Sequence, residues 1–428
     1  MNKRLGGLWQ HPNFLKFWAG ETVSVFGSQI TLLALPLTAV LMLGATPLQM
    51  GILGAVEVAP FLFISLFAGV WVDRWRLRPL MIMVDIGRAI LLGSIPAVYA
   101  LGWLSIEYLY VVAVLTGVFT VFFDVAYQSY LPVLVERDKL VEGNGKLEVS
   151  RSVAQIAGPG LAGTLVQLVS APVTLALDAI SFAFSALFLG LIKHTEPARA
   201  ATQAKHNIWR EIGEGMGVVF GSRYLRPIAA CTGIGNLFGN IGSAVYTIYL
   251  VRELHLDAVV LGLIFGLGSI GALLGALMNG WLTDRLGLGP TILLTAVVFC
   301  IGPLATPLAN GPVPVLMLIL TAGYFITSWS SPIYNINQLS LRQAITPRRL
   351  LGRMNASMRF LVWGTMPVGS LLGGLLGELI GLRATLLVAA LGGFLSVLPI
   401  LFSPVRTLQK QPDPIEEEAP PQPIVTTL

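Results

Sequence analysis

Twelve apolar runs, separated by short polar joints, restrict this chain more than any other feature of its sequence. A helix that crosses a bilayer needs about 20 apolar residues, so twelve crossings would use about 240 residues. Only 11% of the 428 residues are charged, whereas a soluble domain carries about 25%. The pattern predicts an all-α membrane protein with twelve transmembrane helices. The runs cover residues 14–42, 48–72, 79–101, 105–131, 147–169, 172–192, 226–250, 258–283, 290–310, 313–340, 355–380 and 384–403.

Basic residues lie almost entirely in alternate joints. If the runs cross the membrane in turn, 22 of the 27 Lys and Arg residues fall on one side, and only Arg252 and Arg383 on the other. Because basic loops face the cytoplasm, both termini are expected there. The net charge of +5 then reflects topology, and we expect no nucleic-acid partner. The basic start leads into a run too long for a signal peptide, so we expect an uncleaved first helix.

The longest interior joint divides the chain. We expect a first six-helix half at 1–192, a cytoplasmic central loop at 193–225, a second half at 226–405 and a disordered cytoplasmic tail at 406–428. Apolar residues recur at helical spacing between charges in the central loop, which predicts an amphipathic helix on the inner membrane surface. The tail combines prolines with three consecutive glutamates and has no apolar period.

An internal repeat supports two pseudo-symmetric halves. A shift of 211 positions aligns the joints that follow the second helix of each half. Parallel repeats of this kind place a substrate site between the halves near the bilayer midplane. The shift pairs Gly69, Asp73 and Arg74 with Gly280, Asp284 and Arg285, and pairs Gly51, Gly158 and Gly163 with Gly262, Gly369 and Gly374.

These features resemble the major facilitator superfamily over nearly the whole chain except the tail. Segments 69–74, 131–135 and 157–163 are similar to the twelve-helix drug and proton antiporter branch, which includes macrolide efflux proteins and the enterobactin exporter. The resemblance implies a secondary active transporter of the prokaryotic plasma membrane. It would export a drug, macrolide or siderophore-like amphiphile by alternating access in exchange for protons. We expect a monomer that contributes to drug resistance.

In the family, the joint after the second helix forms an inner gate whose aspartate pairs with the other half in the outward-facing state. For Arg76 and Arg78 alone, a positive-inside anchor is the favoured alternative. The second copy lacks the following basic residues, so its gate is expected to be weaker. We expect the gate to comprise Gly69, Asp73, Arg74, Asp85, Arg88, Gly280, Asp284 and Arg285, although Asp85 and Arg88, three residues apart, also fit a structural pair.

The fifth helix contains Gly158, Pro159 and Gly163. The proline removes one backbone donor, and the glycines let a neighbouring helix approach closely. In the family, this kinked signature accompanies exporters. The alternative is a packing kink without directional meaning.

Carboxyl groups within the runs are candidates for proton coupling, because a charge at mid-bilayer costs about 2.5 to 3.5 kcal/mol on insertion scales. Glu57 lies near the midplane without a charged partner on its own helix. Glu21 and Asp124 lie roughly 9 to 14 Å from the inner face. The alternative for Glu57 is a protonated carboxyl that is hydrogen-bonded to a neighbouring helix. The fourth helix lacks the membrane arginine of many proton antiporters in the superfamily, so coupling is inferred from the resemblance.

Polar and aromatic residues of the second half are candidates for lining the substrate site, although interhelical hydrogen bonding explains most of them equally well. We expect no enzyme activity, cofactor or metal site, because the pattern Gly266-x-Gly268-x-x-Gly271 lies within an apolar helix with no preceding strand. The alternatives to an exporter are a facilitator or uptake transporter of the same fold and a non-transporting membrane sensor or scaffold. The lining candidates are Asn236, Asn240, Tyr324, Trp329 and Asn335.

Overall fold

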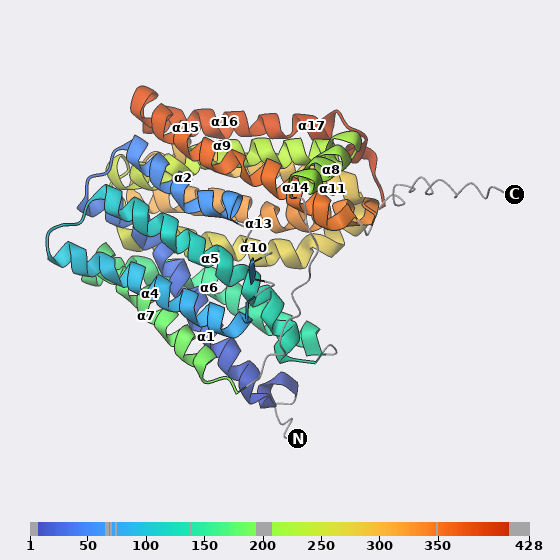
Figure 1. Cartoon of the computed structure of the whole chain (residues 1–428). Coiled ribbons are helices and arrows are strands. Elements are labelled where there is room, and N and C mark those ends of the chain that lie inside the picture. The colour runs from blue at the N-terminus through green and yellow to red at the C-terminus, as the bar shows by residue number, and fades with distance from the viewer. Residues whose placement is uncertain are drawn as a thin grey trace, which may run out of the picture.

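The computed structural model describes residues 7–64, 68, 71–72, 75–136, 139–193, 208–347 and 350–410. Within these ranges the regular structure is entirely helical (Figure 1). Eleven helical stretches are long and apolar enough to cross a membrane, and the apolar helix α2 (Pro47–Phe63) is shorter. The expected all-α fold with about twelve apolar helices is therefore confirmed.

Two helix bundles make up the molecule. The first contains α1 (Pro12–Leu37), extended by η2 (Thr38–Met42), and α2, α4 (Leu77–Ala100), α5 (Ile106–Leu134), α6 (Leu140–Val169) and α7 (Ala171–Gly190). The second contains α9 (Leu225–Arg252), α10 (Ala258–Leu286), α11 (Leu288–Ile301), α12 (Ala305–Leu308), α13 (Val313–Ile345), α14 (Leu351–Trp363), α15 (Thr365–Ile380), α16 (Leu382–Gly393) and α17 (Leu398–Leu401). The remaining elements are α8 (Ile208–Gly221) and the 3-10 turns η1 (Gly7–Gln10), η4 (Gly302–Leu304), η6 (Phe394–Ser396) and η7 (Pro404–Thr407).

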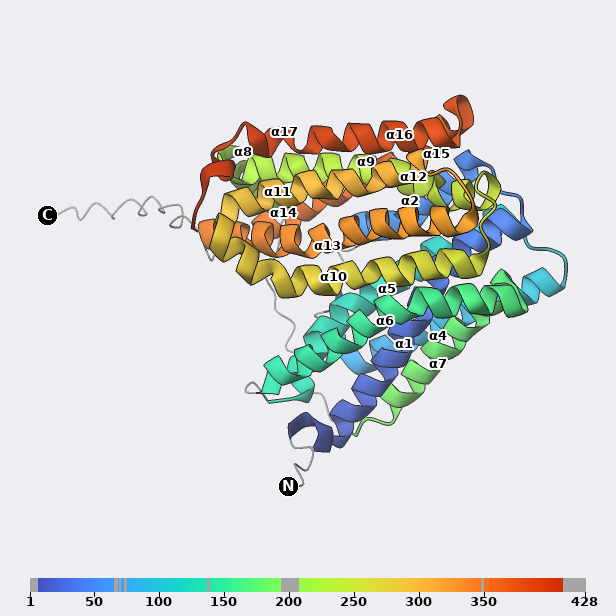
Figure 2. The same cartoon turned by 180° about the vertical axis from the view of Figure 1, so that it is seen from behind.

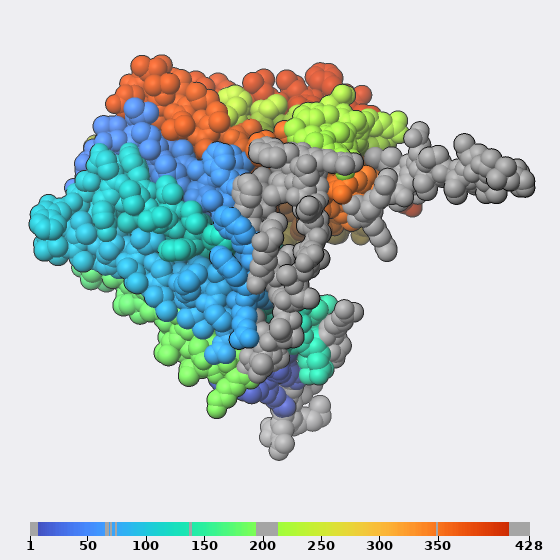
Figure 3. Space-filling view, in the orientation of Figure 1, coloured from blue at the N-terminus to red at the C-terminus, as the bar shows by residue number. Residues whose placement is uncertain are grey.

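The bundles lie together at one end and diverge towards the other, where η1, α8 and η7 are found (Figures 1 and 2). We call this divergent end the chain-end face and the opposite end the far face. Across the bundles, α2 packs against α15 and α6 packs against α10. In the space-filling view, the blue surface of α2 meets the orange surface of α15 (Figure 3).

The apolar core follows the same division. Towards the far face, one continuous cluster joins both bundles, from Leu33 and Leu53 in the first to Val245 and Leu261 in the second. At the chain-end face the core is split into two separate clusters, one around Tyr130 in the first bundle and one around Met354 in the second. Among the described residues, the buried core that the bundles share therefore lies towards the far face, while Phe61 at the other end of α2 makes an edge-to-face ring contact with Trp363 of α14.

Local signals explain where several helices begin. Thr46 accepts the N–H of Gln49, whose side chain accepts the N–H of Thr46, so the pair forms a capping box for α2. Ser105 and Asp257 cap α5 and α10 in the same way with one side-chain oxygen each. Short polar residues at the far-face joints thus fix the first turn of three helices.

The tight turns before α7 and α16 repeat one backbone conformation. Ser170 has φ +84° and Gly381 has φ +85°, and the two positions are 211 residues apart. A positive φ with extended ψ is almost restricted to glycine. The first half therefore places a serine in a turn for which the second half uses glycine.

The helix α8 lies in the central loop and packs against α14. A β-carbon added to Gly215 would lie 2.3 Å from the carbonyl oxygen of Arg353. Arg353 also forms an ion pair with Glu214. The described part of the central loop is thus attached to the second bundle through α14.

Candidate functional site

A cavity of about 920 Å³ lies between the bundles. Its first-bundle wall comes from α1, α2 and α6, and its second-bundle wall from α9, α10, α13, α15 and α16. Four residues of the shared core line it, namely Leu33, Met50, Leu53 and Leu386, so the cavity borders the region where the bundles meet. This volume is within the range of small-molecule binding sites.

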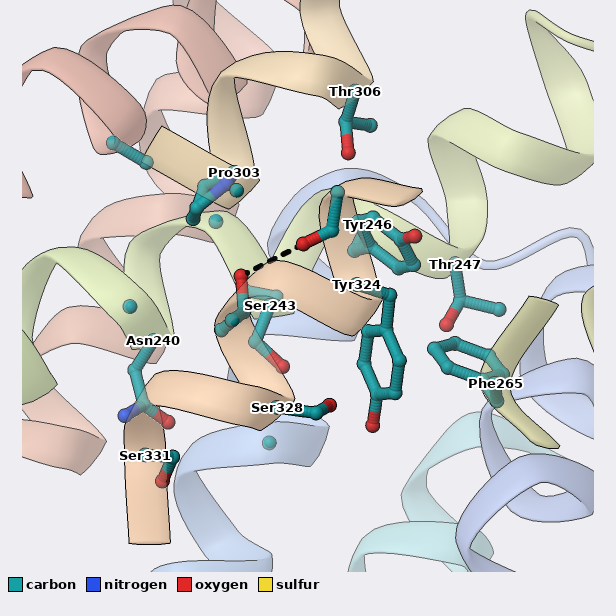
Figure 4. A pocket seen from close by; sticks show the side chains of 18 of the residues that line it. Asn240, Ser243, Tyr246, Thr247, Phe265, Pro303, Thr306, Tyr324, Ser328 and Ser331 are labelled. Carbon is teal, nitrogen blue, oxygen red and sulfur yellow. Dashed lines mark hydrogen bonds between the residues drawn. The ribbon is translucent and has the colours of Figure 1, made fainter. Parts of the chain in front are cut away.

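Neutral polar and aromatic side chains form the second-bundle wall (Figure 4). The ring centroids of Tyr246 and Phe265 are 5.8 Å apart, and those of Phe265 and Tyr324 are 5.1 Å apart in an edge-to-face arrangement. Three helices thereby contribute one aromatic cluster. Hydroxyl and amide groups around it come from Asn240, Ser243, Thr247, Ser269, Thr327, Ser328, Ser331 and Asn335.

The cavity extends into the second bundle at two interrupted helices. α11 ends where Gly302 and Pro303 begin a 3-10 turn, because proline has no N–H to continue the helix. A β-carbon on Gly302 would lie 2.4 Å from the carbonyl oxygen of Gly323, so only glycine fits against α13 here. α16 likewise gives way to the 3-10 turn η6 after Gly393, which lines the cavity. The sequence did not predict this recess.

The first-bundle wall is mostly apolar and includes Glu57 on α2, together with Gln29 and Gln155. Within the described ranges, Glu57 is the one lining residue with a charged group, and none of the described residues forms a hydrogen bond or ion pair with its carboxyl. Its backbone is fixed by close packing, because a β-carbon on Gly117 of α5 would lie 3.2 Å from the carbonyl oxygen of Glu57. A rigid backbone thus presents a half-buried carboxyl to the cavity.

Two glycine contacts, which we call the seams, close the bundles against each other towards the far face. In the α2–α15 seam, a β-carbon on Gly51 would lie 2.5 Å from the carbonyl oxygen of Ser370 and 2.7 Å from the Cα of Gly374. In the α6–α10 seam, a β-carbon on Gly262 would lie 2.4 Å from the carbonyl oxygen of Pro159. Backbones this close leave no room for a side chain.

The seams are images of each other under the 211-residue repeat. Gly163 faces the carbonyl oxygen of Ala258 and the Cα of Gly262, and its counterpart Gly374 faces the carbonyl oxygen of Pro47 and the Cα of Gly51. Of the predicted kink residues, Pro159 and Gly163 thus lie in a seam. Gly158 faces away from it, towards the side chain of Gln29 on α1.

Asp85 and Arg88 pair with each other on α4 and are buried inside the first bundle. The Arg88 guanidinium lies over the rings of Phe123 and Phe182, with its carbon 4.3 and 4.0 Å from their centroids. Both charges therefore lie away from the cavity, and neither bridges the bundles. The pair has the geometry of a structural ion pair.

A further membrane carboxyl, Asp178 on α7, was missed by the sequence reasoning. It is buried and accepts the Thr31 hydroxyl of α1 at 2.5 Å and the Ser181 hydroxyl at 2.8 Å. α1 approaches closely because Gly27 faces Asp178 and Ser181. The signal was present, since Asp178 interrupts an apolar run as Glu57 does.

Glu21 on α1 is half-buried and Asp124 on α5 is exposed. Both lie within electrostatic range of Arg88 and Arg151. Neither is among the residues that line the cavity. These two candidates for proton coupling thus lie towards the chain-end part of the first bundle.

Three of the five lining candidates, Asn240, Tyr324 and Asn335, line the cavity. The side-chain amide of Asn236 donates to the carbonyl oxygen of Val362 at 3.0 Å, which joins α9 to α14. The Trp329 indole N–H points to the sulfur of Met278 at 3.5 Å. Asn236 and Trp329 therefore make interhelical contacts instead.

Of the predicted gate, Gly69, Asp73 and Arg74 lie outside the described residues. The second copy is at the chain-end tip of α10, where Asp284 and Arg285 are exposed. The Arg285 guanidinium lies 4.6 Å from the ring centroid of Trp281. Within the described ranges, no ion pair joins Asp284 to the first bundle in this conformation.

Two repeated bundles around a central cavity define a membrane transporter of the major facilitator class. The chain belongs to the transmembrane secretion effector family of that superfamily, whose sequence profile matches residues 8–427. It is a multi-pass membrane protein that transports small molecules.

Its relatives are bacterial efflux proteins. It is 27% identical to the multidrug efflux pump Tap of Mycolicibacterium fortuitum, covering 92% of this chain and 96% of Tap. It is 22% identical to macrolide efflux protein A of Streptococcus pyogenes, covering 86% and 90%. It is 24% identical to the enterobactin exporter EntS of Citrobacter koseri, covering 96% of each chain.

Solved structures share the fold. A variant of the nucleoside transporter NupG superimposes with a TM-score of 0.75 at 12% identity, covering 91% of this chain and 99% of that one. The inward-facing form of a bacterial ferroportin homologue gives a TM-score of 0.72 at 17% identity, covering 92% and 99%. The outward-facing form of that homologue gives 0.58 at 16% identity, covering 91% and 98%. The TM-score is thus higher for the inward-facing form of that homologue than for its outward-facing form.

Proposed function

We propose that this protein is a secondary active exporter of amphiphilic small molecules, in which the two bundles rock about the central cavity. The single observation that supports this most strongly is the division of the core, which is continuous at the far face and split at the chain-end face around the cavity. We infer that such a structure is closed at the far face and admits substrate from the chain-end face. The efflux proteins among its relatives favour export over uptake.

Proton exchange would supply the energy, with Glu57 as the carrier. A carboxyl in a mostly apolar wall is costly to charge, so it is expected to release a proton only when the environment changes or a compensating charge arrives. Glu57 lies six residues beyond Gly51 on α2, less than two turns from the α2–α15 seam. Opening of that seam would therefore change its exposure. Glu21 is the next candidate.

The chain-end face is proposed to be cytoplasmic, because the first and last described elements, η1 and η7, lie there and the joints at that end are the basic ones. The cavity would then collect substrate from the cytoplasm in the present conformation. Labelling of single cysteines with an impermeant reagent in intact cells tests this orientation. We expect labelling at Thr46 and none at Gln203, and the reverse pattern would contradict it.

The gate residue Asp73 is proposed to pair across the bundles when the chain-end face closes. Asp73→Asn should therefore reduce transport much more than Arg76→Gln, since a gate acid has a specific partner and Arg76 is one of several bases. Transport rates at matched membrane abundance would show the difference. Equal rates would leave the joint as a topological anchor.

Flux in proteoliposomes separates an exporter from a sensor or scaffold with the same fold. Inside-out-oriented protein should accumulate a labelled amphiphilic drug when an imposed pH gradient supplies protons from the lumen. Flux without gradient dependence would indicate a facilitator. No flux above protein-free vesicles for a panel of dyes, macrolides and siderophores would contradict a transport function.

A further inference from the structure

We infer that the cavity binds bulky organic cations and excludes anions of the same shape. The inference rests on the proposed function, because it concerns the substrate of the same cavity. It follows from the charges and aromatic rings of the wall. It narrows the expected substrates from amphiphiles in general to cationic amphiphiles.

The described wall offers one charged group, and that group is acidic. Of the 40 lining residues, Glu57 carries a carboxyl and none is Lys, Arg or His. Within the described ranges, no side chain donates a hydrogen bond to this carboxyl or forms an ion pair with it. A bound cation would therefore supply the partner that Glu57 lacks, and a charge in an apolar cavity is stable only with such a partner.

The aromatic cluster favours the same charge. Phe238, Tyr246, Phe265, Phe299 and Tyr324 line the cavity. The faces of aromatic rings attract cations and repel anions because their quadrupole is negative above the ring. The rings of Phe265 and Tyr324 are arranged edge to face, and those of Tyr246 and Phe265 are tilted by 50°, so a bulky cation finds faces and edges in one cluster.

The buried Arg88 and the partly buried Arg342 are engaged elsewhere and give an anion no partner. Arg88 is paired with Asp85 and stacked between two phenylalanine rings inside the first bundle. Arg342 on α13 donates to Asn355 at 2.8 Å and to Gln338 at 3.2 Å. Neither lines the cavity. A dehydrated anion would thus meet hydroxyl and amide dipoles and one repelling carboxyl.

Tetraphenylphosphonium and tetraphenylborate test the inference, because they have nearly the same shape and opposite charge. Binding of each labelled ion to the purified full-length protein in lipid nanodiscs would be measured against protein-free nanodiscs, which corrects for partition into lipid. We expect saturable binding of the cation, and no binding of the anion above the lipid background. Equal binding of both ions, stronger binding of the anion or no saturable binding of the cation would overturn the inference.

Two variants locate the site. Glu57→Gln should weaken binding of the cation by at least about tenfold, because it removes the one charge of the wall but keeps its shape. The matched control Glu107→Gln removes an exposed carboxyl at the far-face start of α5 and should leave affinity unchanged. Unchanged affinity in a folded Glu57→Gln would overturn the inference. If Glu57→Gln does not fold, the comparison of the two ions in the unmodified protein decides alone.

The inference and the proposed function can fail separately. Selective binding of the cation without flux of any compound would contradict export but leave the charge selectivity intact. Gradient-driven flux of tetraphenylborate, with no flux of the cation, would support export and overturn the charge selectivity.

Discussion

The first bundle keeps ionisable groups in its interior, whereas the second lines its interior with hydroxyl, amide and aromatic groups. Asp85, Arg88 and Asp178 are buried in the first bundle, and Glu57 reaches the cavity from it. The second bundle instead opens a recess at two interrupted helices and surrounds it with neutral side chains. The repeat has therefore kept the helices in register while the chemistry of the two interiors has diverged.

Backbone contacts are what the repeat preserves. Both seams use a glycine facing a carbonyl oxygen across the bundles, at positions 211 residues apart. Such contacts must match on both sides of the cavity if two bundles are to rock as rigid bodies. Side chains inside each bundle face no such constraint. The first bundle thus supplies the carboxyl of the cavity, and the second supplies most of its neutral polar groups and its aromatic rings.

The largest expected effect is at Glu57. Glu57→Gln keeps the shape of the neutral acid but cannot release a proton, so uphill transport should fall by at least about tenfold. Exchange down a substrate gradient should persist at substrate concentrations that saturate the weakened site. Accumulation in proteoliposomes under an imposed pH gradient measures uphill transport, and substrate counterflow measures exchange. Wild-type accumulation by the Gln variant would remove Glu57 as the carrier and leave Glu21 as the candidate.

The seams should respond alike to substitution. Gly51→Ala and Gly262→Ala each place a methyl group within 2.5 Å of a carbonyl oxygen, so both should weaken far-face closure and slow transport by about tenfold, which corresponds to about 1.4 kcal/mol. The control Gly160→Ala lies beside the α6–α10 seam with nothing within 4 Å of the added carbon. Transport rates of the three variants test this, and a defect in only one seam would show that the seams are not equivalent.

The ion pair of the first bundle should contribute stability and no transport chemistry. Removing one partner, as in Asp85→Asn or Arg88→Met, should cost about 3 to 5 kcal/mol because the other charge stays buried. The variant with both substitutions should lose less stability than the sum of the two single losses. Thermal unfolding in detergent measures the three losses. Additive losses would mean that the two side chains do not stabilise each other.

The smallest expected effect is in the turn that the repeat shares. Ser170→Gly should stabilise the protein by about 1 kcal/mol because it relieves a strained serine, and Gly381→Ser should destabilise it by a similar amount. The same unfolding measurement applies to both. Stability changes of opposite sign in the two variants would support equivalent turns. A destabilised Ser170→Gly would indicate that the serine side chain has a separate role.

Helix positions could be predicted from the sequence because the spans are long and mostly apolar runs. The predicted span 313–340 corresponds to α13 at Val313–Ile345, and 172–192 to α7 at Ala171–Gly190. The residues of the site were harder to predict from the sequence. Asn236 and Trp329 have the composition of lining residues, but packing between neighbouring helices turns their side chains to Val362 and Met278. The recess at Gly302 depends on contacts between helices distant in sequence, which no local pattern records.

The repeat gave the most reliable information on function. The shift pairs Gly51 with Gly262, and the structure places both glycines at contacts between the bundles. For Asp178, by contrast, the sequence showed the residue but not its contacts. It was visible as a carboxyl within an apolar run, but its hydrogen bonds to Thr31 and Ser181 become evident only when α1 and α7 are placed together.

The central claim, that the bundles rock about the cavity, is tested most directly by distances between spin labels. Cysteines at Trp103 and Leu308 would report across the far face, and those at Val141 and Phe402 across the chain-end face, in a background without Cys231 and Cys300. All four positions are exposed. Addition of tetraphenylphosphonium or a change of pH should lengthen the first distance and shorten the second together. Distances that stay fixed in every condition, or that change in the same direction, would contradict alternating access.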